Sequence, residues 1–367
     1  MEKKKIIPQY EPLFGFDEAK AVYKYMVRGG WLTEHEETRT FENKVAKFLG
    51  VEYCSAVNNG TISLSLALLA LGVKTGDRVI VPSLSMIATA NAVRFIGAKP
   101  IFVDVEEKTL CMDIDKTIEL AKLYEVKAII YVSLNGRRTC TGQLKFYCKT
   151  HNIGFLEDAA QAFGSSHSCN KMIGNLADIT SFSLSPHKII STGQGGLLVT
   201  NDGKLAEKIH RLKDFGRDLG GNDIHEHFGI NSKFTDIQAV IGMRQLNQIH
   251  YRMEYKKELY LLYESLLKDV KEVQFIPTNT LHTVPWFIDI YVEDREALAY
   301  WLKSCGVITR NLYPPIHKQK CYGISTQTLP VTEKYSKMGL WLPSSFNLER
   351  KDVEYVCKKI GEFYSAK

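Results

Sequence analysis

The hydrophobic pattern changes its period repeatedly along the chain, and each change predicts a different element. Short apolar runs of strand length occur at residues 53–57, 78–82, 100–104, 126–132 and 154–157. Segments with apolar residues at helical spacing lie between them, at residues 62–71, 88–95, 115–124 and 144–151. Strands that alternate with helices in this way predict an α/β fold, with a mostly parallel sheet sandwiched by helices.

The two ends of the chain follow other patterns. An arm with Pro8 and Pro12 precedes two expected helices, one at 16–27 and one that contains Phe41 and Leu49. After a helix at 205–215 and a loop at 216–228, a long helix is expected at 237–266. The last third predicts a smaller α/β unit with strands at 286–292 and 307–310 and helices at 295–305 and 351–364. We therefore expect a large domain at 1–245, which includes the arm, and a small C-terminal domain at 246–367.

Composition narrows the class of protein. The 367 residues are 45% hydrophobic and 24% charged, which is typical of a globular enzyme. The net charge of +6 is spread along the chain, so we expect no nucleic-acid partner. There is no apolar run of membrane-spanning length and no signal segment. The eight cysteines include no C-x-x-C pair, and His225 and His227 lack further ligands, so we expect no metal and a cytoplasmic location.

Polar segments follow three of the expected strands. They are Asn58–Thr61, Glu157–Gln161 and Ser183–Lys188. Ligands of parallel sheets bind at the carboxyl ends of strands, so these segments are expected to meet. Gly60 and Thr61 also begin a helix, where backbone N–H groups and the helix dipole attract an anion.

Lys188 lies in an apolar and hydroxyl-rich stretch that ends in Thr192-Gly-Gln-Gly-Gly196. A buried lysine can lose its proton near neutral pH and form an imine with a carbonyl compound such as pyridoxal phosphate (PLP). Asp158, 30 residues earlier, could keep a pyridine nitrogen protonated, and Gln161 would lie on the same side. Each residue also has a plain interpretation: a surface lysine for Lys188, a helix cap for Asp158 and a strand-end hydroxyl for Ser183. The order of phosphate anchor, carboxylate and lysine along successive βα units favours the cofactor site.

The chain resembles the DegT-type sugar aminotransferase family of fold type I PLP enzymes, and within it the nucleotide-sugar 4-aminotransferases. The resemblance covers nearly the whole chain and rests on these motifs: Gly30–Thr33, Asn58–Thr61, Val81–Ser83, Ile87–Asn91, Glu157–Ala162, Phe182-Ser183, Lys188 with Thr192–Gly196, Gly229–Asn231, Tyr313–His317 and Leu340–Pro343.

The resemblance implies a role for each matching residue. Lys188 would be the catalytic lysine that binds PLP and moves the proton, and Asp158 would pair with the pyridine nitrogen. The other cofactor-binding residues would be Gly60, Thr61 and Ser183 at the phosphate, Gln161 at the phenolic oxygen and Met86 on the ring. Asn231 would reach the phosphate in the neighbouring subunit of a homodimer. Trp31, Leu32, Thr33, Tyr313 and His317 would contact the nucleotide-sugar, although Trp31 and Tyr313 could instead be core residues and His317 a surface imidazole.

The implied reaction moves an amino group from glutamate, through pyridoxamine phosphate, to a nucleotide-linked 4-keto-6-deoxysugar of the kind used in O-antigen and other glycan biosynthesis. Relatives that act as 3-dehydratases have histidine at the lysine position. Here His187 precedes Lys188, and the spacing to Thr192-Gly193 favours Lys188 as the active residue. A nucleotide-sugar dehydratase and a non-catalytic PLP-binding regulator of the same fold are the two alternatives.

Three departures from the family pattern stand near the expected site. Met86 replaces the usual aromatic residue, but a thioether can also pack on a ring face. Ser133 and Asn135 stand where histidine and tyrosine are common, so we expect a changed pocket near the sugar. Gln194 replaces the commoner glutamate and removes one charge near the lysine.

Overall fold

The computed structural model describes residues 6–218, 223–323 and 326–366, and within them the chain forms two β-sheets. The larger sheet has seven strands in the order β1-β7-β6-β5-β4-β2-β3. They are β1 (Tyr53–Val57), β2 (Arg78–Pro82), β3 (Lys99–Val103), β4 (Val126–Val132), β5 (Gly154–Asp158), β6 (Ile179–Ser183) and β7 (Gly196–Thr200). Only β7 runs antiparallel to its neighbours, which confirms the mostly parallel sheet.

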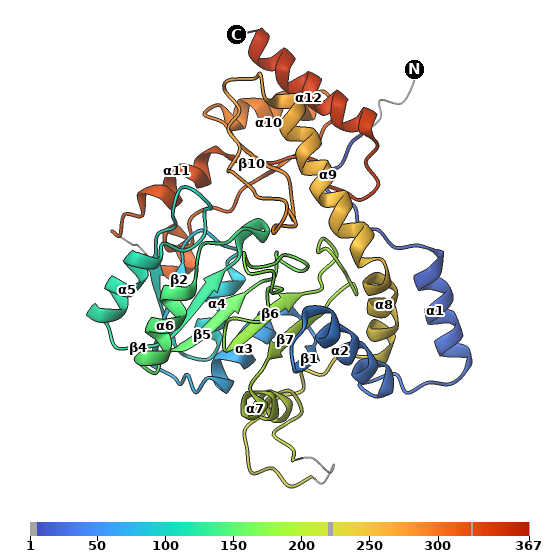
Figure 1. Ribbon diagram of the computed structural model, residues 1–367, viewed down its shortest axis with the longest axis vertical. Coiled ribbons are helices and arrows are strands. Elements are labelled where there is room, and N and C mark those ends of the chain that lie inside the picture. The colour runs from blue at the N-terminus through green and yellow to red at the C-terminus, as the bar shows by residue number, and fades with distance from the viewer. Residues whose placement is uncertain (1–5, 219–222, 324–325, 367) are drawn as a thin grey trace.

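The large sheet carries apolar side chains on both of its faces, and both faces are covered by other parts of the protein. In β2, Val79 and Val81 pack in the core beneath α3 (Gly60–Ala70), whereas Ile80 packs in the opposite core. The second core includes residues of α5 (Ile114–Leu123) and α6 (Gly142–Thr150). Successive residues of a strand point to opposite faces, so a run of aliphatic residues can fill both cores at once. In Figure 1, α5 and α6 lie at one end of the sheet and α2 (Glu36–Leu49), α8 (Asp236–Asn247) and α1 (Phe16–Val27) lie at the other.

The C-terminal third forms the smaller unit that the sequence predicts. A three-stranded sheet in the order β8-β10-β9 contains β8 (Asp289–Tyr291), β9 (Arg310–Asn311) and β10 (Gly339–Trp341). Its helices are α10 (Arg295–Ser304), α11 (Pro330–Met338) and α12 (Arg350–Ser365). The helix α9 (Ile249–Leu267) leads from α8 to this unit, as Figure 1 shows.

Several expected boundaries differ from the structure. The long helix expected at 237–266 is two helices, because the chain breaks at Gln248. The strand expected at 286–292 keeps only Asp289–Tyr291, since the N–H of Phe287 donates to the Asn135 side chain instead of to a strand. Elements α11 and β10 were not expected. The division into domains at residue 245 stays a prediction, although the helix break lies near it.

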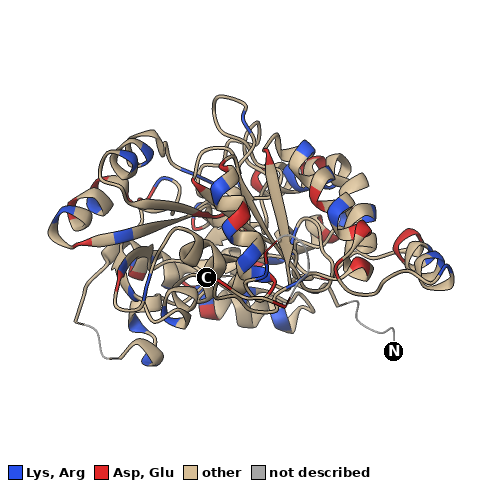
Figure 2. Ribbon diagram, turned by 90° about the horizontal axis from the view of Figure 1, so that it is seen from below, with Lys and Arg blue, Asp and Glu red and all other residues tan. Residues whose placement is uncertain are grey.

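The remaining helices of the larger unit are α4 (Ala88–Phe95) and α7 (Gly203–Lys213). The N-terminal arm crosses to the smaller unit, where buried Ile7 pairs with Val307. Lys and Arg positions are interspersed with Asp and Glu positions along the helices in Figure 2, as the modest net charge suggests. Among the helices of the described residues, none is long and apolar enough to cross a membrane.

Candidate active site

A cavity of about 550 Å³ lies at the carboxyl ends of the parallel strands and collects all three predicted polar segments. The predicted site residues that line it are Gly60, Thr61, Met86, Asp158, Gln161, Ser183, Lys188 and Tyr313. They come from the start of α3, the turn before α4, the end of β5, the end of β6 and a loop after β9. The parallel sheet therefore brings together residues that are far apart in the sequence.

The start of α3 forms one wall of the cavity. The helix is capped by Asn59, whose side chain accepts a hydrogen bond from the N–H of Ile62 at 2.9 Å. Two glycines let the backbone pack closely here. A Cβ on Gly60 would lie 3.0 Å from the Cβ of Ser183, and a Cβ on Gly196 would lie 2.6 Å from the carbonyl oxygen of Asn59. The helix N-terminus is thus held beside a serine hydroxyl, which is a suitable cradle for a phosphate group.

Lys188 is buried, with 8% of its surface exposed, and its Nζ lies 4.0 Å from the ring centroid of Trp286. Burial lowers the pKa of Lys188 to about 7, against the opposing effect of the Asp158 carboxylate, and Arg310 lowers it further. The Tyr10 hydroxyl lies 3.5 Å from the backbone carbonyl of Lys188. The surface interpretation of Lys188 is therefore wrong, since its side chain is buried and its amine lines the cavity.

Asp158 ends β5 and is also buried. Burial raises the pKa of its carboxyl group, while hydrogen bonds from Thr89 Oγ1 at 2.7 Å and the Ala160 N–H at 3.2 Å oppose that shift. The carboxylate lines the same cavity as Lys188. Its side-chain donor, Thr89, belongs to α4 and lies within the Ile87–Asn91 motif, but its role was not predicted from the sequence.

Gln161 is fixed in orientation by two contacts. Its Oε1 accepts a hydrogen bond from the N–H of Asn135 at 2.8 Å, and its Nε2 lies 3.3 Å from the hydroxyl of Tyr313. Tyr313 is buried and packs edge-on against Trp341 with ring centroids 4.8 Å apart. Met86 is 44% exposed at the cavity, so its thioether is available to a ligand.

Five predicted residues do not line this cavity: the exposed Trp31, Leu32, Thr33 and Asn231, and the buried His317. Trp31 and Leu32 are 65% and 50% exposed, and the indole of Trp31 donates to Thr33 Oγ1 at 2.6 Å. Asn231 is also exposed. The interpretation of Trp31 as a core residue is therefore wrong, and the exposed positions are open to a neighbouring molecule.

His317 is fully buried, so its interpretation as a surface imidazole is wrong. Its Nδ1 lies 2.6 Å from Ser83 Oγ, and its Nε2 lies 3.2 Å from Glu333 Oε1. Burial lowers the pKa of His317 despite the nearby Glu333 carboxylate. With both ring nitrogens occupied, His317 holds the loop that carries Tyr313 and does not line the cavity.

The side chains of Ser133 and Asn135 are bonded to other parts of the protein and stay out of the cavity. Ser133 donates to Glu157 Oε1 at 2.7 Å, and both residues are buried. The Asn135 side chain exchanges hydrogen bonds with the backbone of Phe287 at 2.7 and 2.8 Å. Neither side chain lines the cavity, and the changed sugar pocket at these positions stays a prediction.

Two further cavity neighbours were missed. Arg310 lines the cavity, and its guanidinium lies 5.3 Å from the ring centroid of Trp341. Trp286 contacts the Lys188 amine, as described above. Both come from the smaller unit, and a lone arginine or tryptophan in an expected strand carries no sequence signal for this position.

Comparisons with known proteins agree with this geometry. The sequence model of the DegT/DnrJ/EryC1/StrS aminotransferase family matches residues 16–361 of this chain. The chain is 35% identical to GDP-perosamine synthase of Escherichia coli O157:H7, over 99% of this chain and 100% of that protein. It is 31% identical to UDP-2-acetamido-2-deoxy-3-oxo-D-glucuronate aminotransferase of Pseudomonas aeruginosa, over 93% and 94% of the two chains.

The solved structures lead to the same group. The aminotransferase TlmJ of Streptoalloteichus hindustanus superposes with a TM-score of 0.90 at 30% identity, over 98% of this chain and 99% of that one. The fold, the cavity and the similar proteins together identify the chain as an aminotransferase that belongs to the DegT/DnrJ/EryC1/StrS family.

Proposed function

We propose that this aminotransferase uses PLP to move an amino group from glutamate to a nucleotide-linked 4-keto-6-deoxysugar. The observation that carries the proposal is the buried amine of Lys188, with a pKa lowered to about 7, in one cavity with the buried carboxylate of Asp158. A lysine in this state is a nucleophile and a base at neutral pH.

The residues of the cavity fit PLP. The Gly60–Thr61 helix start and Ser183 suit its phosphate, because the missing Cβ of Gly60 lets the helix start pack closely against the Ser183 hydroxyl. Asp158 suits the pyridine nitrogen, Gln161 the phenolic oxygen and Met86 one ring face. When bound, PLP supplies an electron sink that stabilises negative charge at the carbon next to the transferred nitrogen.

The side chains of the chain then have separate tasks. Lys188 would hold the cofactor covalently, and its Nζ, once free, would accept a proton from Cα of the amino donor. Burial lowers the pKa of this amine, which favours the neutral form that the task requires, and Asp158 would keep a positive charge at the ring nitrogen. Arg310 supplies a cation at the cavity for the carboxylate of glutamate.

The acceptor is proposed from the relatives. Among the similar proteins are GDP-perosamine synthases, one of them 35% identical over its full length, and this supports a perosamine-synthase-like reaction at C4 of the sugar. Other relatives are named for other amino sugars, so the nucleotide of the substrate and the sugar carbon that receives the amino group must be determined by assay.

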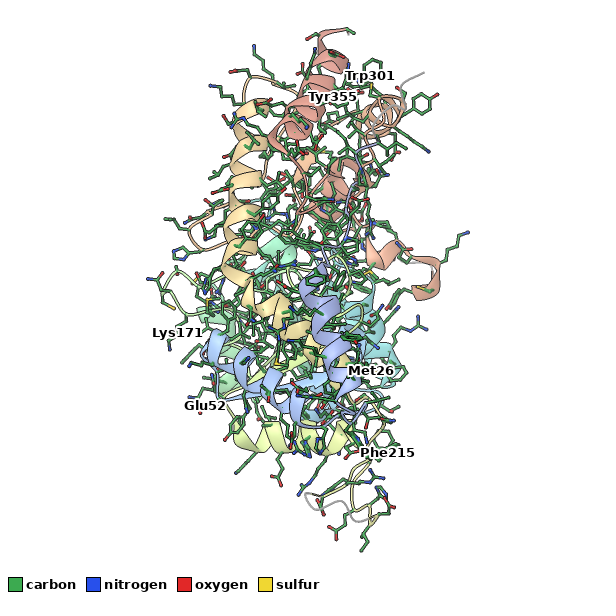
Figure 3. The ribbon with its side chains drawn as sticks, turned by 90° about the vertical axis from the view of Figure 1, so that its right-hand side faces the viewer. Met26, Glu52, Lys171, Phe215, Trp301 and Tyr355 are labelled. Atoms are coloured by element: carbon green, nitrogen blue, oxygen red, sulfur yellow. The ribbon has the colours of Figure 1, made fainter. Side chains whose placement is uncertain are left out.

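A homodimer with shared sites is part of the proposal. Trp31, Leu32 and Asn231 are exposed and lie outside the cavity of their own chain. Helix α1 exposes apolar side chains, including Tyr23 at 69% and Met26 at 49%, and Figure 3 shows Met26 on the outer side of that helix. A second copy would cover this surface and bring Asn231 to the neighbouring phosphate. Light scattering should give a dimer mass.

The test of the function is an assay of the PLP-loaded protein with glutamate and a panel of GDP-, dTDP- and UDP-linked keto-deoxysugars. We expect 2-oxoglutarate and an amino sugar in equal amounts with one of the 4-keto substrates. Borohydride reduction followed by peptide mass spectrometry should find the cofactor on Lys188, and a Lys188→Ala protein should show neither attachment nor turnover. Loss of water from the sugar without use of glutamate would instead indicate a dehydratase, and bound cofactor that is inert to glutamate would indicate a regulator.

A further inference from the structure

A second cavity, of about 410 Å³, lies apart from the first and is lined by residues of four loops and the start of α6. Its charged or titratable lining side chains include Arg137, Arg138, His167 and His282, and none of the described lining residues is Asp or Glu. The cavity therefore has a cationic character that neither the proposed reaction nor the family comparison uses.

His167 is the first sign of a missing partner. It is 3% exposed and lines the cavity, yet neither of its ring nitrogens has a hydrogen-bond partner among the described residues. Its place is fixed by a tight turn, in which the His167 N–H donates to the carbonyl of Lys171 at 2.7 Å and its own carbonyl accepts from the N–H of Asn170 at 2.8 Å. A buried imidazole that satisfies neither nitrogen is costly, so a ligand that accepts a hydrogen bond from it would stabilise this arrangement.

Arg138 gives a second, independent sign. Its Nη1 is buried without a partner, while its Nη2 donates to Thr141 Oγ1 at 3.1 Å. The guanidinium of Arg138 is thus held in place by Thr141, while its Nη1 lacks a hydrogen-bond partner among the described residues. Arginine in such a position binds a planar or tetrahedral anion through parallel N–H groups.

Helix α6 adds a third positive element. It begins at Gly142, and its N-cap residue, Thr141, makes no side-chain capping hydrogen bond. Both residues line the cavity. The first N–H groups of an uncapped helix and the positive end of its dipole favour an anion in that place.

Neighbouring acids do not cancel this charge. The guanidinium of Arg137 donates two hydrogen bonds to the carboxylate of Asp289, at 2.7 and 3.0 Å. The charges of these two groups therefore neutralise each other. Glu157 interacts with Arg138, but its carboxylate faces Ser133 and does not line the cavity. Nη1 of Arg138 therefore has no carboxylate partner among the described residues.

We propose that this cavity binds a phosphate dianion, either free phosphate or the phosphate group of a small ester. A phosphate has several acceptor oxygens that point in different directions, which matches the separate donors of Arg138, His167 and the α6 N-terminus better than a flat carboxylate does. The volume exceeds that of a phosphate ion and leaves room for the organic part of an ester.

The test is titration calorimetry on PLP-saturated protein, in which the cofactor occupies the other phosphate cradle. Inorganic phosphate and glucose 6-phosphate form the two arms, so the tighter ligand distinguishes the free ion from an ester. We expect Arg138→Gln and His167→Ala each to weaken binding about tenfold or more, the loss of one charge-assisted or buried hydrogen bond. Lys171→Gln is the matched control, because Lys171 is exposed at the end of the same turn and lies at the periphery of the molecule in Figure 3.

The variant Arg310→Gln, which changes the first cavity, tests whether phosphate binds there or in the second cavity. The proposal expects its affinity for phosphate to equal that of the parent protein. Circular dichroism of each variant confirms that it is folded, and two independent variants guard against the failure of one. The proposal is overturned if neither ligand binds, if binding is lost in Arg310→Gln, or if folded Arg138→Gln and His167→Ala both bind as tightly as Lys171→Gln.

Discussion

The pKa of Lys188 is the property on which the proposed chemistry depends most directly. Burial lowers it from an ordinary 10.5 to about 7. At pH 7 an amine with the ordinary pKa is neutral in about 0.03% of molecules, whereas Lys188 would be neutral in about half, a gain of roughly 1,500-fold. We therefore expect Lys188 to react as a free amine at a pH where exposed lysines do not.

Trace acylation of the cofactor-free protein measures this directly. The protein is labelled briefly at a series of pH values from about 5.5 to 10 and the peptides are quantified by mass spectrometry. Lys188 lines a cavity of about 550 Å³, so a small reagent can reach it. Its labelling should reach half of its maximum near pH 7. Exposed Lys171 in the same samples is the internal control for the extent of labelling.

Two variants give opposite shifts. Asp158→Asn removes the carboxylate that raises the pKa of Lys188, so the midpoint should fall. Arg310→Gln removes a positive charge that lowers this pKa, so the midpoint should rise. A wild-type midpoint above about pH 9, or shifts of the reverse sign, would refute the reasoning, because burial and these two charges would then not control the amine.

Three further substitutions test the surrounding structure. Lys256→Met removes a buried amine whose pKa is lowered by burial to about 7. The same amine in the unfolded chain keeps its proton up to about pH 10.5, so the free energy of unfolding of wild type should rise between about pH 7 and 9. Urea denaturation should show that this rise is about 2 kcal/mol larger in wild type than in the variant. Arg137→Leu leaves Asp289 buried without its ion pair, and should cost about 3–5 kcal/mol in the same assay. Asp236→Ala removes the carboxylate that accepts the N–H groups at the start of α2, and should lower the free energy of unfolding by about 2 kcal/mol. Burial raises the pKa of Asp236, but these hydrogen bonds lower it overall, so the difference from wild type should shrink as the pH falls below about 4.

The sequence predicts the large sheet well because its strands are buried on both faces. A strand such as β4 is then almost wholly apolar, with Lys127 as its one charged residue, and such runs stand out between amphipathic helices. The smaller unit is harder to predict because its strands are two or three residues long. Elements of that length are fixed by partners elsewhere in the chain, as Leu340 is by Ile290 and Asn311, and periodicity does not report such partners.

The residues of the candidate site also fall into two groups, those at the large sheet, which the sequence predicts, and those of the smaller unit, which it does not. Gly60, Asp158 and Lys188 each follow a strand of one parallel sheet, so chain order alone places them at a common edge. Arg310 and Trp286 reach the cavity from the smaller unit, and their position depends on how the two units pack. Their contribution to the pKa or packing of Lys188 could be found only from the folded structure.

Asn135 shows how that packing reaches the cofactor side of the cavity. Its backbone lies in the left-handed region with φ of 55°, a conformation that asparagine tolerates better than most residues. Its side chain is held by Phe287 and by Asp289, which Arg137 holds in turn. The same residue presents its N–H to Gln161. The orientation of the Gln161 amide is therefore set by the backbone of Asn135, and the side chain of Asn135 serves to fix that backbone to the smaller unit. A residue that departs from the family pattern can thus keep the geometry of the cavity without entering it.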